Sequence, residues 1–221
     1  MQQTSTGAPF NIIRHQDFYT VQGVLLSKEA YGDIQVTTDQ LYGGRSETQS
    51  ELAKTGWLGS APLITALLTT LHGKQDQEGV EYLRKLFAHE FFIGMMTSTR
   101  ITYRAEAPDL VTHDIGTPEQ RTLESHLVGP DGYVTAEMGD ITQALLGNKD
   151  TDKVRAVYKW ITGRETNLWL INERPKQDQE WALVFGYNYF GDFGVTNIGI
   201  DSKGPARGIR VAPQSSTISK D

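Results

Sequence analysis

Cysteine is absent from this chain of 221 residues, which excludes disulfide bonds, thiolate nucleophiles and zinc sites built from cysteine. A chain of this length buries about 70% of the surface of its unfolded form, so a stable core is possible without such cross-links. The absence does not identify a compartment, because a reducing cytoplasm and an assembled virion both accept a cysteine-free protein.

Runs of lysine and arginine are also missing, and the formal net charge is -6. A protein that binds the phosphate backbone usually carries a basic stripe, so we expect no nucleic-acid partner. The longest apolar stretches, 61–71 and 86–96, are interrupted by polar residues and are too short to span a bilayer. Residues 1–10 lack the apolar segment of a secretory signal. We therefore expect no membrane insertion, and a location in the cytoplasm or in a virion.

Motifs for metal binding and nucleophilic catalysis are missing too. The five histidines do not pair at the helical i, i+4 spacing of a zinc site, and no His-Glu-x-x-His occurs. The acidic run 148–152 lies between two predicted helices, where helix capping explains it. Ser60 does not lie in a Gly-x-Ser-x-Gly turn, and the chain has no phosphate-binding loop. We predict no metal, no cofactor and no enzymatic activity.

Apolar residues at helical spacing predict a helical middle of the chain. One helix starts after Ser60, whose side chain can cap the free amides, and ends at Gly73. Further helices are expected over 77–93, 140–146 and 150–162.

Strand signals occupy both ends of the chain. Short apolar bursts separated by glycine and aspartate predict strands within 10–40, and alternation predicts another over 97–104. Residues 105–125 are expected to be loops. Four short strands are predicted near the C-terminus, at 167–171, 181–185, 195–200 and 208–212.

Together these patterns predict an α+β fold in which two or more helices pack on a small, mostly antiparallel sheet, with a strand-rich C-terminus. No shift in composition marks a domain boundary. We therefore predict a single domain over 10–213, preceded by a flexible segment at 1–9 and followed by a flexible tail at 214–221.

The most distinctive stretch is VFGYNYFGDFGVTNIGI, residues 184–200. Its aromatic residues alternate with glycine, asparagine and aspartate, which is the mixture that loop-borne recognition surfaces use. Aromatic rings give a large contact area for little rotamer entropy, and small polar residues give adaptable hydrogen bonds. The same residues would also suit a hairpin with a buried aromatic face, so both interpretations stay open at this point.

Four C-terminal segments follow one another in an order that resembles a known family. They are NLWLINE at 167–173, WALVFGYN at 181–188, FGVTNIGID at 193–201 and GPARGIRVAP at 204–213. The order is similar to the C-terminal sheet of the C-type-lectin-like fold in its cysteine-free bacterial, phage and archaeal form. That form has a Trp-Leu strand, here starting at Trp169, and ends in a Gly-x-Arg strand, here starting at Gly208. The resemblance covers about the last quarter of the chain.

Within this fold, the chain most resembles the variable proteins of diversity-generating retroelements. In that family, mutagenesis at the adenines of a template rewrites a cassette near the C-terminus, and the massive sequence variation falls on solvent-facing residues that bind diverse ligands. Residues 185–201 contain no Lys, Glu, Gln, Met or Trp, which are the residues that adenine randomisation of an asparagine codon does not produce. The formylglycine-generating branch needs catalytic cysteines, and calcium-dependent lectins need Glu-Pro-Asn or Gln-Pro-Asp, so neither activity is expected.

The resemblance implies a ligand-binding display protein with a sequence-variable recognition surface at about 185–201. Its ligand would be a protein or another molecule of a cell surface, and a homo-oligomer is an open possibility. The residues expected to form the contact surface are Phe185, Tyr187, Asn188, Tyr189, Phe190, Asp192, Phe193, Thr196 and Asn197. The residues expected to belong to the scaffold are Trp169, Trp181, Gly208 and Arg210.

Two other functions remain open. The chain could be a structural subunit of a virion or tail that uses the same aromatic surface for assembly. It could also be an enzyme with a site in its middle, formed by His89, Asp109, His113 and Asp114.

Overall fold

The computed structural model describes residues 8–27, 30–41, 47–114, 117–122, 133–134, 139–169, 174–187 and 193–213. Within these residues the chain is α+β, as the sequence predicts, with five helices and three sheets. The neighbouring strands are antiparallel, except for one parallel pair.

The five helices are α1 (Gln49–Ala53), α2 (Ala61–His72), α3 (Val80–Ile93), α4 (Gly139–Leu146) and α5 (Thr151–Thr162). The predicted helices correspond to α2 to α5, whereas α1 has only one turn and lacks a recognisable period. The helix α3 starts three residues later than predicted, because Gly79 precedes it with a left-handed φ of 83°. In the part of the chain that the structure describes, no helix has the length and apolarity that crossing a bilayer requires.

A four-stranded sheet combines both ends of the described chain. Its strands are β1 (Asn11–Arg14), β2 (Phe18–Leu25), β3 (Tyr31–Gln40) and β13 (Arg207–Val211), in that spatial order. The predicted terminal strand therefore pairs with β3, which lies more than 160 residues earlier. It does not join the other C-terminal strands in one sheet, in contrast to the expectation from the sequence.

A seven-stranded sheet forms the other layer, in the order β7-β6-β5-β10-β11-β9-β8. Its strands are β5 (Met95–Tyr103), β6 (Leu110–Asp114), β7 (Thr117–Thr122), β8 (Tyr133–Val134), β9 (Thr166–Trp169), β10 (Gln179–Tyr187) and β11 (Phe193–Gly199). The prediction of a small sheet is wrong, because the presumed loops at 105–125 contain β6 and β7. The pair β9–β11 is parallel, and a third sheet joins β4 (Glu47–Thr48) to β12 (Lys203–Gly204).

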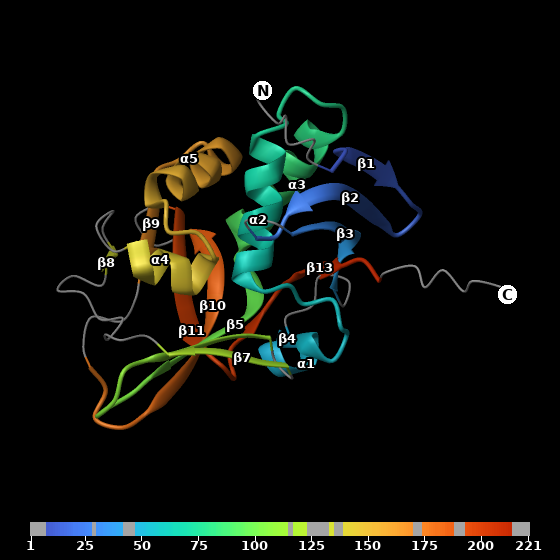
Figure 1. Cartoon of the computed structure of the whole chain (residues 1–221). Coiled ribbons are helices and arrows are strands. Elements are labelled where there is room, and N and C mark those ends of the chain that lie inside the picture. Colours follow the sequence, from blue (N-terminus) through green and yellow to red (C-terminus); the bar gives the residue numbers. More distant parts are fainter. Residues whose placement is uncertain are drawn as a thin grey trace, which may run out of the picture.

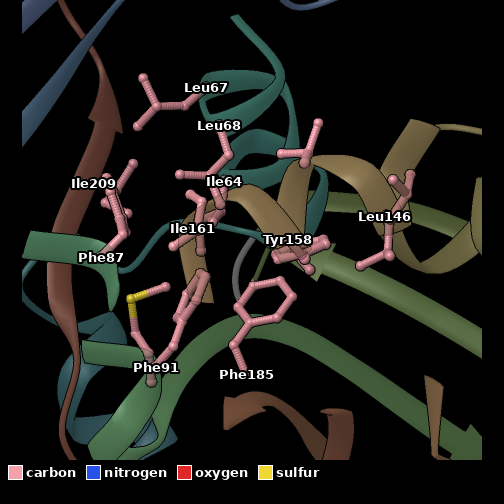
Figure 2. Close-up of a cluster of buried hydrophobic side chains, with 14 of the residues drawn as sticks. Ile64, Leu67, Leu68, Phe87, Phe91, Leu146, Tyr158, Ile161, Phe185 and Ile209 are labelled. Carbon is pink, nitrogen blue, oxygen red and sulfur yellow. The ribbon is translucent and has the colours of Figure 1, made fainter. Parts of the chain in front are cut away.

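The main core lies between the helices and the two larger sheets (Figure 1). Buried side chains of α2, α3 and α5 converge there on Phe185 of β10, as Figure 2 shows. The rings of Phe91, Tyr158 and Phe185 lie within 6 Å of one another, with centroid distances of 5.4 to 5.9 Å. Such tilted aromatic packing adds to the stabilisation from burial of apolar surface.

The start of α2 is capped from a strand and not from the helix itself. Ser60 occupies the N-cap position, but its side chain makes no capping hydrogen bond. Instead, the amide of Ala61 donates to the Thr99 hydroxyl of β5 at 2.9 Å. The prediction of the helix boundary is thus confirmed. The predicted capping group is wrong, because a free amide at a helix end can donate to any acceptor that the tertiary structure brings close to it.

Candidate functional site

The aromatic stretch singled out by the sequence folds as a β-hairpin. Strands β10 and β11 pair antiparallel from Trp181 opposite Gly199 to Tyr187 opposite Phe193. The five connecting residues, 188–192, lie outside the described residues. The hairpin lies inside the seven-stranded sheet, because β10 also pairs with β5 and β11 also pairs with β9.

Strand β10 is buried on both of its faces. Leu183 and Phe185 belong to the main core, and both are 0% exposed. Val184 points to a second cluster, which contains Leu52 of α1 and Met96 of β5. Phe185 therefore packs on helices and cannot contact a ligand at the surface, so its assignment to the contact surface is wrong. For this residue, the alternative of a buried aromatic face is correct.

Polar contacts hold the hairpin on its neighbours where the strand ladder is interrupted. The register between β10 and β5 shifts between Ala182 and Val184. There the Thr97 hydroxyl donates to the Leu183 carbonyl at 2.9 Å, and so occupies an acceptor beside the bulge. Further along β10, a Cβ on Gly186 would lie 3.3 Å from the Cα of Gly94, which ends α3. The hairpin and the end of α3 thus approach each other backbone to backbone.

An exposed apolar pair lies at this end of α3. Phe92 is 70% exposed and Ile93 is 41% exposed. Gly94, with φ of 89°, ends the helix and directs the chain into β5, whose first residue Met95 pairs with Phe185. The pair therefore lies beside the end of the hairpin from which 188–192 extend. An exposed aromatic ring next to a loop on a packed sheet is typical of a binding surface.

The other predicted contact residues can be placed only in part. Tyr187 is the last residue of β10, and Phe193 is the first residue of β11. Thr196 and Asn197 lie within β11, paired with Val184 and Leu183. The remaining members of the predicted set, Asn188, Tyr189, Phe190 and Asp192, lie outside the described residues.

The predicted scaffold residues lie in both of the larger sheets. Arg210 stacks its guanidinium on the Trp57 ring, 3.7 Å from the ring centroid, and donates from Nε to Gln35 at 2.9 Å. Gly208 lies so close to β3 that a Cβ would be 2.4 Å from Thr37 Cγ2. Trp181 is half-buried against the main core, and Trp169 ends β9.

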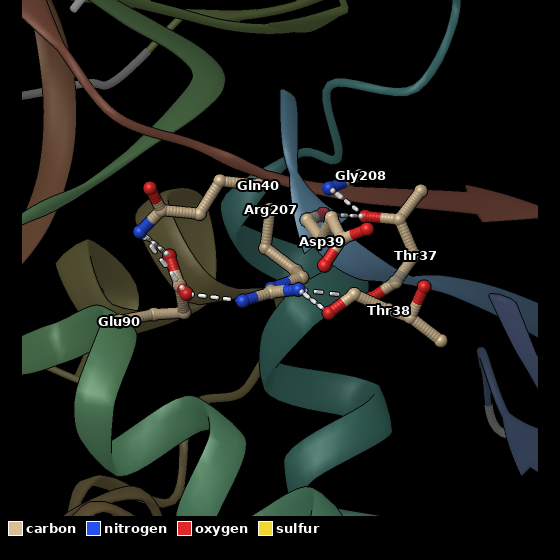
Figure 3. A network of polar contacts seen from close by, with 7 residues as sticks. All are labelled: Thr37, Thr38, Asp39, Gln40, Glu90, Arg207 and Gly208. Atoms are coloured by element: carbon tan, nitrogen blue, oxygen red, sulfur yellow. Dashed lines mark hydrogen bonds and ion pairs between the residues drawn. The ribbon is translucent and has the colours of Figure 1, made fainter. Parts of the chain in front are cut away.

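A buried polar network beside Gly208 was missed by reasoning from sequence. Arg207 of β13 forms an ion pair with Glu90 of α3 and donates to the carbonyls of Thr37 and Thr38 (Figure 3). Gln40 donates to both oxygens of Glu90 at 3.1 and 3.2 Å. The only signal in the sequence is Glu90 itself. This charged residue lies on the apolar stripe of α3, three residues after Phe87 and directly before Phe91.

The residues of the enzyme alternative have separate local partners. The Nδ1 of His113 lies 3.2 Å from the Thr99 hydroxyl that caps α2. Asp109 accepts from the backbone amide of Arg104 at 2.8 Å, and His89 is exposed on α3. Among the described residues, no group of three or more carboxylates and histidines is arranged to hold a metal ion.

Comparisons of the chain with protein-family models, with curated proteins and with solved structures find no match.

Proposed function

We propose that this chain is a binding protein that recognises a protein or another macromolecule with the end of the β10–β11 hairpin. Phe92 and Ile93 form the contact surface among the described residues, and the predicted contact residues within 188–192 belong to the same proposal. The observation that carries the proposal is the large exposure of the Phe92 ring next to the hairpin end. Exposed aromatic residues are frequent among the residues that dominate binding energy.

The burial of the hairpin base supports the same proposal. Phe185 and Val184 anchor β10 in two separate clusters, one on each face of the sheet. A binding surface on a fixed base loses little conformational entropy when it binds. The hairpin thus combines a fixed base with an end composed of aromatic, glycine and asparagine residues.

The test uses two exposed aromatic residues of the same helix. A peptide library displayed on phage would be selected on the wild-type chain, and the selected peptides would be measured on Phe92→Ser/Ile93→Ser. We expect affinity to fall by about tenfold or more. Tyr82→Ser is the matched control, because Tyr82 is 50% exposed on the same helix. Selected peptides that bind both variants as tightly as the wild type would contradict the proposal.

The C-type-lectin-like fold and the sequence variability are a finer part of the proposal, supported by the order of the C-terminal segments. They predict a near-copy of the DNA for about 168–210 that differs mainly at adenines and lies beside a reverse-transcriptase gene. A genome without such a copy would contradict the proposal that the protein is sequence-variable. The proposal of a binding surface at Phe92 and Ile93 would not be affected.

Assembly is a second candidate use of the same surface, because exposed Phe92 and Ile93 would also suit contact with another subunit. Light scattering over a range of concentrations distinguishes the two. An oligomer that is lost in Phe92→Ser/Ile93→Ser favours assembly, and a wild-type chain that stays monomeric favours ligand binding.

A further inference from the structure

A concave surface runs along α2, and its residues are separate from those of the hairpin. It is a half-open groove of about 770 Å³, bordered by α2, the end of β2 with the start of β3, and the connection from α4 to α5. None of its described lining residues belongs to β10 or β11. Volumes of this size are typical of sites for small molecules.

The described lining of the groove is mainly apolar. Phe10, Leu26 and Leu63 are half-buried in it, and two further large side chains are more exposed. Leu25 is 44% exposed and Tyr31 is 46% exposed. Large apolar side chains exposed together in a concavity are costly to hydrate, and they are expected where an apolar ligand covers them.

Positive charge borders the same groove. Lys74, Lys149 and Lys153 are exposed and line it, and none of them forms an ion pair with a described carboxylate. Asp150 is the one acidic residue in the described lining, and its carboxylate accepts from the Lys153 amide as the cap of α5. The local charge is therefore positive, although the chain as a whole carries -6.

One hydroxyl in the lining also lacks a partner. Thr69 Oγ1 is inaccessible to solvent and makes no hydrogen bond with the described residues. Its neighbours on the same helix, Thr65 and Thr70, donate to the carbonyls four residues earlier. An isolated buried hydroxyl costs free energy, but an oxygen that solvent does not reach offers no contact to a ligand in the open groove.

We propose that the groove binds the anion of a long-chain carboxylic acid, with the alkyl chain on Leu25, Tyr31 and Leu63 and the carboxylate toward Lys149 and Lys153. The apolar lining matches an apolar body, and the exposed lysines match a negative end. Residues 1–7, which precede the lining residue Ala8, are mostly polar and do not match such a lining.

The experiment is a calorimetric titration of the full chain with dodecanoate below its micelle concentration. We expect a single site, with binding that weakens as salt is added because the lysines are exposed. Dodecanol has the same chain without the charge and should bind about tenfold more weakly. Lys149→Glu/Lys153→Glu should weaken dodecanoate binding by about tenfold as well and leave dodecanol unchanged.

Two further variants make the test specific. Lys176→Glu alters an exposed lysine outside the described lining and should bind dodecanoate like the wild type. Thr70→Trp places a large side chain in the groove and should abolish binding of both probes, with thermal unfolding measured to verify the fold. The proposal is overturned if dodecanoate does not bind, if the double lysine variant binds it unchanged, or if the chain binds only to phosphatidylglycerol vesicles. These variants leave Phe92 and the hairpin intact, so the outcome is independent of the binding surface proposed above.

Discussion

Arg207 of β13 and Glu90 of α3 form an ion pair in which the side chains are only 4% and 0% exposed. The pair connects β13 of the four-stranded sheet to α3, which packs on β10 of the seven-stranded sheet. Gln40 also donates to Glu90, and the carbonyls of Thr37 and Thr38 accept from Arg207, whose Nε has no partner among the described residues. A buried pair with this many partners fixes the position of β13.

Removal of one member of the pair should destabilise the chain strongly. Glu90→Ala leaves the Arg207 guanidinium buried without its carboxylate, and we expect a loss of about 3–5 kcal/mol in the free energy of unfolding. Urea denaturation followed by circular dichroism measures it. Glu90→Leu/Arg207→Met, which replaces both charges by apolar groups, should lose much less than the sum of the single variants. Additive losses would show that the two charges are not coupled.

The two phenylalanines near the hairpin should respond in opposite ways. Phe185→Ala removes a ring with no exposed surface and should cost about 3–5 kcal/mol in the free energy of unfolding. Phe92→Ala removes a ring that is 70% exposed and should change stability by less than about 0.5 kcal/mol. Both are measured by urea denaturation. A large loss for Phe92→Ala would place it in the core and remove it from the proposed contact surface.

The sequence predicts those parts of the fold that depend on neighbours in the chain. The helix α5 has Asp150 as its N-cap, accepting from the Lys153 amide, and Gly163 with φ of 72° at its end. Cap, apolar stripe and stop signal all lie within 14 residues, so the predicted bounds are confirmed. The strands β10 and β11 are predicted for the same reason, because alternating residues and glycines mark a hairpin locally.

The arrangement of the strands is not predictable in this way. The pairing of β13 with β3 depends on Arg207, Thr37 and Gln40, which meet only in the folded chain. The burial of Phe185 likewise follows from Phe91 and Tyr158 on two helices far away in sequence. The pattern of residues identifies a strand, but it does not show which strand it pairs with or which of its faces are buried. The sequence alone therefore could not show which aromatic residues of the stretch belong to the core and which to a contact surface.

Stability at alkaline pH should depend on Tyr158. Burial raises the pKa of its hydroxyl above the usual value of about 10, and the hydrogen bond with Thr65 offsets only part of this. Above about pH 10 the unfolded chain therefore loses this proton while the folded chain keeps it. The contribution to stability is complete below about pH 10 and decreases as the pH rises, by up to about 1.4 kcal/mol per pH unit.

The variant Tyr158→Phe isolates that contribution. At neutral pH it should be less stable by about 1 kcal/mol, because the hydroxyl that shares a hydrogen bond with Thr65 is removed. The difference from the wild type should decrease above about pH 10, since phenylalanine has no proton to lose. Urea denaturation between about pH 7 and about pH 11 measures the difference at neutral pH and its decrease, because the ordinary tyrosine pKa of about 10 lies within this range. A difference that stays constant over this range would mean that Tyr158 ionises equally in both states.

The capping of α2 gives the last prediction. Thr99 accepts from the Ala61 amide at 2.9 Å, and its hydroxyl also lies 3.2 Å from Nδ1 of His113. Thr99→Val keeps the shape of the side chain but leaves this buried amide without its acceptor, so the free energy of unfolding should fall by about 1–3 kcal/mol. Ser60→Ala is the matched control, because Ser60 holds the N-cap position without a capping hydrogen bond, and it should change stability by less than about 0.5 kcal/mol. If urea denaturation gives the reverse order, the helix is capped by its own serine and the strand contributes only packing.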